Sequence, residues 1–137
     1  MMLDTNVVID LTQAGGDEFS DASLDCLAQY VGRVEFYINH IVYAEVAPKV
    51  DDRAGFDQQL ANLGIKVAPL DVNDAWRAGI AFREYCERGA PRSTILPDFL
   101  IGGQAANRGW PIMTRDAKRF ASYFPELEVI DPTRKRA

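Results

Sequence analysis

The N-terminal segment reads Leu3-Asp4-Thr5-Asn6-Val7-Val8-Ile9, in which a polar triplet separates apolar residues. We expect a short buried strand that ends near Asp4, followed by a helix that begins around Asn6. This change from strand to helix within a few residues is typical of a βα unit, in which the strand lies inside a sheet and the helix covers it.

The rest of the chain repeats the alternation. The expected strands are 34–38, 65–70, 111–114 and 127–130, and the expected helices are 20–31, 41–46, 51–63, 71–88, 94–107 and 116–123, with a loop at 13–19. Strands that alternate with helices predict an α/β fold. We expect a central, mostly parallel sheet of four to five strands, flanked by helices on both faces through right-handed crossovers.

Length and composition restrict the class of protein. The chain has 137 residues, of which 47% are hydrophobic and 26% charged, an ordinary balance for one globular domain. We expect a single domain over 1–137, with 131–137 as a loose tail. No apolar run approaches the roughly 20 residues that span a bilayer. Asp4 also stands where a signal peptide would carry positive charge, so we expect a cytoplasmic protein without a membrane association.

Few chemistries remain open to this sequence. His40 is the single histidine, which excludes sites with several imidazole ligands. Cys26 and Cys86 form no C-x-x-C pair, and we expect two mostly buried thiols rather than a disulfide or a zinc site. The chain contains no P-loop, G-x-G-x-x-G or G-x-S-x-G motif. Carboxylates are the reactive groups that it carries in quantity.

Four acidic residues have positions that suit a common site: Asp4, Glu45, Asp98 and Asp116. Ligand sites of open parallel sheets form outside the carboxyl ends of the strands. Asp4 and Asp116 follow expected strands, whereas Glu45 and Asp98 lie on expected helices. If the first strand and 111–114 are neighbours in the sheet, all four carboxylates can converge at one edge.

Four carboxylates at one place repel one another unless a cation neutralises them. Oxygen ligands without nitrogen or sulfur select hard cations, so we expect Mg²⁺ or Mn²⁺. Such ions lower the pKa of a bound water and stabilise the oxyanions of phosphodiester cleavage. Each acid also has a structural interpretation: Asp4 and Asp116 as helix N-caps, Glu45 as a surface residue, and Asp98 as a complement to a helix dipole.

Charge is unevenly distributed. Residues 1–82 carry a balance of −8, whereas residues 83–119 carry +3, within a net charge of −5. Binding of phosphate depends on local potential, so an acidic chain can still bind nucleic acid. Solvated helix faces are the alternative explanation for the basic residues. The candidates for contact with an RNA backbone are Arg83, Arg88, Arg92, Arg115, Lys118 and Arg119.

Four segments together resemble the PIN-domain family, and more narrowly its VapC-type toxin ribonucleases from toxin–antitoxin pairs. They are Leu3-Asp4-Thr5-Asn6-Val7-Val8-Ile9-Asp10, Tyr43-Ala44-Glu45-Val46, Pro97-Asp98-Phe99-Leu100-Ile101 and Met113-Thr114-Arg115-Asp116-Ala117-Lys118-Arg119-Phe120. The resemblance covers essentially the whole chain in the family's order. The opening L-D-T-N and the T-R-D-x-x-x-F segment are its specific parts.

The resemblance implies a single PIN-like nuclease domain that acts as a metal-dependent endoribonuclease. Specific RNA recognition usually targets unpaired loops, so we expect a structured RNA such as a tRNA loop as substrate. Asp4, Glu45, Asp98 and Asp116 match the family's acidic positions, and Asp4, Asp98 and Asp116 match its metal ligands. Asn6 and Thr114 match positions that support the acidic cluster. The resemblance also implies a homodimer and a cognate VapB-type antitoxin that covers the acidic site.

Gly102-Gly103 departs from the small alanines that often follow Asp98 in such proteins. Each glycine inside a helix costs about 1 kcal/mol relative to alanine. We therefore expect this pair to pack closely against a neighbouring segment or subunit.

Two other functions stay open on sequence alone. A PIN fold that binds RNA or a protein without cleaving would be a silent binding module. An aspartyl phosphatase would place its nucleophile after the first strand, but that D-x-D-x-[TV] motif needs a second aspartate where this chain has Asn6.

Overall fold

The computed structural model describes residues 1–13, 17–89 and 96–134 of the chain. Its strands are β1 (Met2–Leu3), β2 (Phe36–Ile38), β3 (Ile65–Val67), β4 (Ile112–Met113) and β5 (Val129–Ile130). Its α-helices are α1 (Thr5–Thr12), α2 (Glu18–Ala28), α3 (His40–Val46), α4 (Arg53–Asn62), α5 (Val72–Glu87), α6 (Leu96–Arg108) and α7 (Ala117–Tyr123), and a 3₁₀ turn, η1 (Ala47–Lys49), follows α3. The predicted alternation of strands and helices is confirmed.

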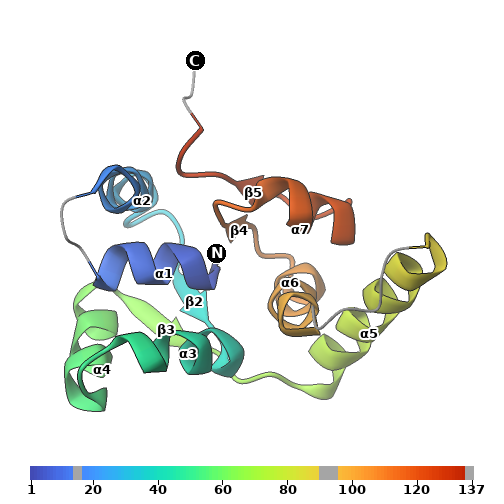
Figure 1. Cartoon of the computed structure of the whole chain (residues 1–137), viewed down its shortest axis with the longest axis horizontal. Coiled ribbons are helices and arrows are strands. Elements are labelled where there is room, and N and C mark those ends of the chain that lie inside the picture. The colour runs from blue at the N-terminus through green and yellow to red at the C-terminus, as the bar shows by residue number, and fades with distance from the viewer. Residues whose placement is uncertain (14–16, 90–95, 135–137) are drawn as a thin grey trace.

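The five strands form one all-parallel sheet in the order β3-β2-β1-β4-β5. The chain moves from β1 to β2 and β3 in one direction, and then returns past β1 to β4 and β5. With right-handed crossovers, α1 to α4 cover one face of the sheet and α5 to α7 the other. Figure 1 shows these two sets of helices gathered on opposite sides of the view. The predicted α/β fold with helices on both faces is confirmed.

The strands are shorter than the sequence predicts. Residues 34–35 and 68–70 were expected in strands, but ladder pairing covers only Phe36–Ile38 and Ile65–Val67. The apolar pattern continues past the point where the backbone leaves the ladder: Ala68 is still buried beside the sheet and donates its amide to Ile38 O at 2.8 Å. The apolar sequence pattern reflects burial, and the buried stretch is longer than the part of the chain that pairs in the sheet.

Side-chain caps fix the starts of several helices. Asp17 accepts a hydrogen bond from the Ser20 amide, so α2 begins at Glu18, inside the segment expected to be a loop. Asn39 accepts from the amides of Ile41 and Val42 and starts α3 one residue earlier than expected. The expected start of the sixth helix at Thr94 lies outside the described residues, as do Gly15-Gly16 and residues 135–137 of the expected tail.

The core lies on both sides of the sheet, and its largest members are aromatic. Phe99 of α6 stacks on Tyr123 with ring centroids 4.4 Å apart and contacts Phe124 at 5.8 Å. Both phenylalanines are fully buried.

The two cysteines form no disulfide, as expected; Cys26 is buried and Cys86 is partly exposed. None of the helices in the described parts of the chain has the length and apolar character to cross a bilayer.

Gly102 and Gly103 allow α6 to approach its neighbours. A Cβ on Gly103 would lie 2.7 Å from Ala78 Cβ and 2.8 Å from Ala78 Cα in α5. A Cβ on Gly102 would lie 2.4 Å from the Phe124 ring. The expected close packing against a neighbouring segment is therefore confirmed, and the neighbours are α5 and the Phe124 side chain.

We predict that Gly103→Ala lowers the free energy of unfolding by about 1–3 kcal/mol, because the added methyl meets the backbone of α5. The matched control is Gly79→Ala, also in a helix, where a Cβ has nothing within 4 Å. That change should raise stability by up to about 1 kcal/mol through helix propensity. Urea unfolding of the two variants measures both effects; equal gains would contradict the close packing.

Candidate active site

The candidate site lies between the carboxyl ends of β1 and β4, where the order in which the chain adds strands to the sheet reverses. These strands are parallel neighbours, with Met2 opposite Ile112 and Leu3 opposite Met113. The Asp4 amide donates to Met113 O at 3.0 Å, so Asp4 and Thr114 leave the sheet side by side. The pairing of these two strands, which the sequence analysis gave as a condition, is therefore present. Ligands of open α/β sheets bind at such a switch point.

Asp4 is buried, with only 3% of its surface exposed, and its two carboxylate oxygens have different partners. Oδ1 accepts from the Thr5 amide at 2.8 Å, which makes Asp4 the N-cap of α1. Oδ2 accepts from Thr114 Oγ1 at 2.8 Å and from Asn6 Nδ2 at 3.2 Å. The capping interpretation of Asp4 is correct, but it accounts for one oxygen only. The other oxygen faces the end of β4.

Asn6 and Thr114 hold Asp116 beside Asp4. The Asn6 amide group donates to Asp116 Oδ2 at 3.2 Å as well as to Asp4. The Asp116 amide donates to Thr114 Oγ1 at 3.0 Å, while the Arg115 amide donates to Asn6 Oδ1 at 3.2 Å. Asp116 precedes α7 but makes no capping bond with its side chain. Its carboxylate is therefore available to the site rather than used by the helix.

Asp98 and Glu45 approach the same place from two helices. Asp98 is in the first turn of α6, and its side chain is 16% exposed. Glu45 lies exposed on α3, where its Oε1 accepts from Thr5 Oγ1 at 2.7 Å. Thr5 was not among the predicted site residues, although it belongs to the L-D-T-N segment. Its hydroxyl ties Glu45 to the residue that follows Asp4.

The carboxylates influence one another's ionisation. Burial raises the pKa of Asp4 to about 6, against the lowering effect of its bonds from Thr114 and Thr5, and the charge of Asp98 adds to the rise. Burial also raises the pKa of Asp98, and so do the charges of Glu45 and Asp116. The structure therefore brings the four predicted acids into one electrostatic cluster, which we call the acidic cluster.

Arg119 is the cation that faces the acidic cluster. Its Nη2 lies 2.8 Å from Asp116 Oδ2 and its Nε 3.4 Å from Asp98 Oδ2. Within 1–13, 17–89 and 96–134, no other cationic side chain forms an ion pair with the four acids. Its charge lowers the pKa of both Asp98 and Asp4.

The acidic cluster fits a hard divalent cation by the chemistry of its donors. Its donors are carboxylate oxygens, with the hydroxyls of Thr5 and Thr114 beside them. Two of its carboxylates have raised pKa values that a cation would lower. In the described parts of the chain, no three acidic, histidine or cysteine side chains are close enough to hold an ion as they stand. Two of the acids turn toward Arg119 instead.

The other basic candidates have separate partners. Arg115 lies 2.9 Å from the buried Asp10 carboxylate, and its guanidinium lies over the Phe19 ring at 4.5 Å. Arg83 lies 3.9 Å from Glu87, and Arg88 donates to Ser122 O at 3.1 Å. Lys118 is exposed on α7, next to Arg119. Arg92 lies outside the described residues.

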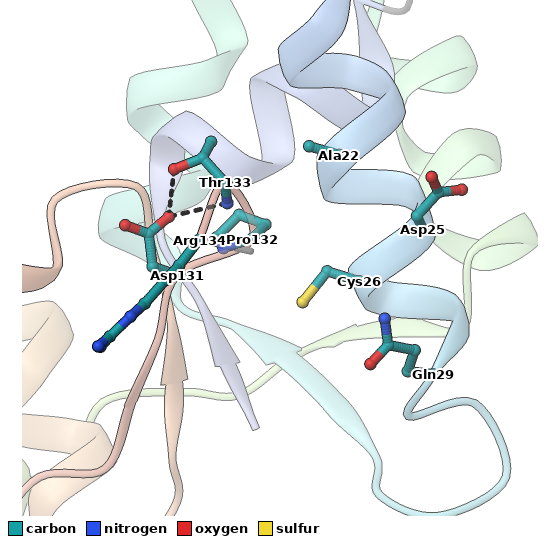
Figure 2. Close-up of a pocket in the computed structure, with 8 residues that line it drawn as sticks. All are labelled: Ala22, Asp25, Cys26, Gln29, Asp131, Pro132, Thr133 and Arg134. Carbon is teal, nitrogen blue, oxygen red and sulfur yellow. Dashed lines mark hydrogen bonds between the residues drawn. The ribbon is translucent and has the colours of Figure 1, made fainter. Parts of the chain in front are cut away.

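A separate hollow of about 550 Å³ lies between α2 and residues 131–134. Figure 2 shows Cys26 and Gln29 on its helical wall and Asp131 on the other. Asp131 Oδ1 accepts hydrogen bonds from both the amide and the hydroxyl of Thr133. The hollow shares no residue with the acidic cluster, which remains the candidate active site.

Comparisons with known proteins find relatives of this fold. A family model described as PIN domain matches residues 1–123. A comparison with curated proteins found no match.

Several solved structures share the fold at low identity. A chain of the VapBC2 crystal structure from Rickettsia felis, bound to a promoter DNA fragment, has a TM-score of 0.74 and 18% identity over 95% of this chain and 96% of that one. A chain of a toxin–antitoxin complex from Klebsiella pneumoniae has a TM-score of 0.71 and 20% identity over 98% of both chains. A chain of FitAcB from Neisseria gonorrhoeae has a TM-score of 0.68 and 18% identity over 96% of both chains.

The raised pKa of Asp4 predicts a pH dependence of stability. The folded pKa of about 6 exceeds an unfolded value near 3.9, so the folded state binds the extra proton between these pH values. Without metal, the wild-type protein should lose up to about 3 kcal/mol of stability as the pH rises from about 4 to 6 because of Asp4.

The wild type is compared with Asp4→Asn, which removes the titrating group. The unfolding free energy of the variant minus that of the wild type should increase across this pH range in urea titrations with EDTA present. A difference that stays constant with pH would show that Asp4 is not held in the buried environment described.

Proposed function

The chain belongs to the PIN-domain family, and on that premise we propose that it is a metal-dependent endoribonuclease, the toxin of a toxin–antitoxin pair. The observation that carries the proposal is the convergence of Asp4, Asp98 and Asp116 at the β1–β4 switch point, with Glu45 attached through Thr5. Oxygen donors of this kind suit Mg²⁺ or Mn²⁺, the ions that hydrolytic sites for phosphodiesters commonly use.

We assign the residues of the acidic cluster as follows. Asp4, Asp98 and Asp116 would hold the divalent cation, directly or through water, and Glu45 would orient the attacking water or hold a second ion. The bound cation would supply a Lewis acid for the scissile phosphate. Thr114 and Asn6 support the ligands, because their hydrogen bonds fix the carboxylates of Asp4 and Asp116 before any ion arrives.

The pKa directions agree with these roles. A buried carboxylate whose pKa is raised to about 6 is costly to ionise alone, and a nearby divalent cation favours its charged form. Cation binding should therefore release protons at pH below about 6 and be strongest above it. The same reasoning applies to Asp98, whose pKa burial also raises.

RNA contact is proposed for the surface beside α7. Lys118 and Arg119 are exposed there, and Arg119 contacts the acidic cluster, so both can neutralise backbone phosphates of an RNA bound at this surface. Sequence-specific readers of RNA usually bind unpaired loops, which supports a structured RNA such as a tRNA loop as substrate. Arg115 is bound to Asp10 and is not part of this proposal.

We also propose protein partners, an antitoxin and a second copy of the chain. Support comes from the solved neighbours, which include a toxin–antitoxin complex and VapBC2 bound to DNA. Apolar surface is present for such contacts: Val72 and Trp76 lie one turn apart on α5 and are 82% and 73% exposed. An arginine of the antitoxin would suit the acidic cluster, since guanidinium pairs strongly with carboxylates.

The function is tested with partner-free protein and total cellular RNA in Mg²⁺, Mn²⁺ or EDTA, with new 5′ ends mapped by sequencing. We predict discrete cuts that need metal and that fall at least about a hundredfold in Asp4→Asn and Asp116→Asn, since these acids act together on one ion. Asp21→Asn, an exposed aspartate of α2, is the matched control and should cut at the wild-type rate.

Cuts that persist in EDTA, or in both cluster variants, would contradict the proposed chemistry. RNA that binds to folded protein without being cut would favour the silent binding module instead.

A further inference from the structure

Arg119 links two elements of the acidic cluster. Asp98 belongs to α6 and Asp116 to the turn after β4, and the guanidinium pairs with both, at 3.4 Å and 2.8 Å. The arginine side chain is 41% exposed, whereas that of Asp98 is only 16% exposed. The Asp116 side chain is 50% exposed, so the arginine connects a mostly buried carboxylate with an exposed one.

Arg119 contacts one oxygen of each of two proposed metal ligands. Asp116 Oδ2 receives Arg119 Nη2 and also Asn6 Nδ2. Asp98 Oδ2 has Arg119 Nε as its described ionic partner. A divalent cation that takes these oxygens competes with the guanidinium, because the two positive groups repel each other at such short separation.

We propose that Arg119 is a built-in counter-ion that competes with the divalent cation for Asp98 and Asp116, and so sets the metal concentration at which the site fills. This inference rests on the proposed function, because it takes these acids as metal ligands. It changes the role of Arg119 from a residue that only contacts RNA to a positioning residue that acts through the two carboxylates. Displacement also frees the guanidinium for an RNA phosphate.

Removal of the competitor has opposite effects on the two states of the protein. Without Arg119, the metal-free cluster keeps its mutual repulsion and loses its counter-ion, so the metal-free protein becomes less stable. The metal-bound state loses nothing at the two carboxylates, so metal affinity rises. Lysine keeps the charge but cannot bridge two carboxylates as the planar guanidinium does, and its effect should be intermediate.

The experiment titrates metal-free protein with Mn²⁺ at pH 7.5 and measures free Mn²⁺ by electron paramagnetic resonance, with no RNA present. We expect Arg119→Gln to bind Mn²⁺ about tenfold more tightly than wild type, the size given by loss of two partly exposed ion pairs. Arg119→Lys should lie between them. Arg53→Gln is the matched control for net charge, because Arg53 pairs with Asp57 on the surface of α4.

The control should bind Mn²⁺ as the wild type does. Equal or weaker binding by Arg119→Gln would overturn the competition, as would the same gain in Arg53→Gln, which would show an effect of net charge alone. If wild type and every variant fail to bind Mn²⁺, the proposed metal site itself is wrong. Failure of this inference is therefore distinct from failure of the proposed function.

A second measurement follows Arg119 in the unaltered protein, and variants serve only to assign its resonance. The Nε–Hε resonance of Arg119, identified by its absence from Arg119→Gln or Arg119→Lys, should shift as Mg²⁺ is added and should do so with the same midpoint as metal binding. A resonance that stays unchanged while the site fills would show that the guanidinium keeps its place and would overturn the competition.

Discussion

The desolvated carboxylate of Asp4, fixed between the ends of two neighbouring strands, is the constraint on which the rest of the site depends. Its burial is costly, and the bonds from Thr5, Asn6 and Thr114 offset the cost only in part, since its pKa remains raised to about 6. The negative charge of Asp98 disfavours ionisation of Asp4 further, so a nearby cation is needed to stabilise both carboxylates in their charged forms. Arg119 supplies positive charge through its ion pairs with Asp98 and Asp116.

Local patterns predicted the fold class, which is confirmed, and they singled out four acidic residues whose roles stay predictions. Apolar runs followed by helical periodicity gave the alternation, and the L-D-T-N and T-R-D segments marked the ends of two strands. That those strands are neighbours is a property of the topology, and no local pattern contains it. The convergence of Asp4 and Asp116 therefore required the structure, in which β1 pairs with β4.

The basic residues show what a local pattern leaves undetermined. Arg115 and Arg119 lie four positions apart in one basic segment and were both predicted to contact RNA. In the fold, Arg115 meets a buried aspartate 105 residues away, Asp10, whereas Arg119 turns toward Asp98 and Asp116. Partners so distant in sequence decide what a charge does, and a count of charges cannot reveal them. The glycines of α6 are the opposite case, because their cost in a helix correctly predicted a close neighbour.

The central claim, that the β1–β4 switch point gathers its carboxylates around a divalent cation, is tested most directly by crystals soaked in Mn²⁺. The anomalous scattering of manganese locates the ion independently of any activity. The account predicts a peak within bonding distance of at least two carboxylates among Asp4, Asp98 and Asp116, with the Arg119 guanidinium moved away from Asp116. A peak located elsewhere, or none at saturating Mn²⁺ with the cluster accessible, would contradict it.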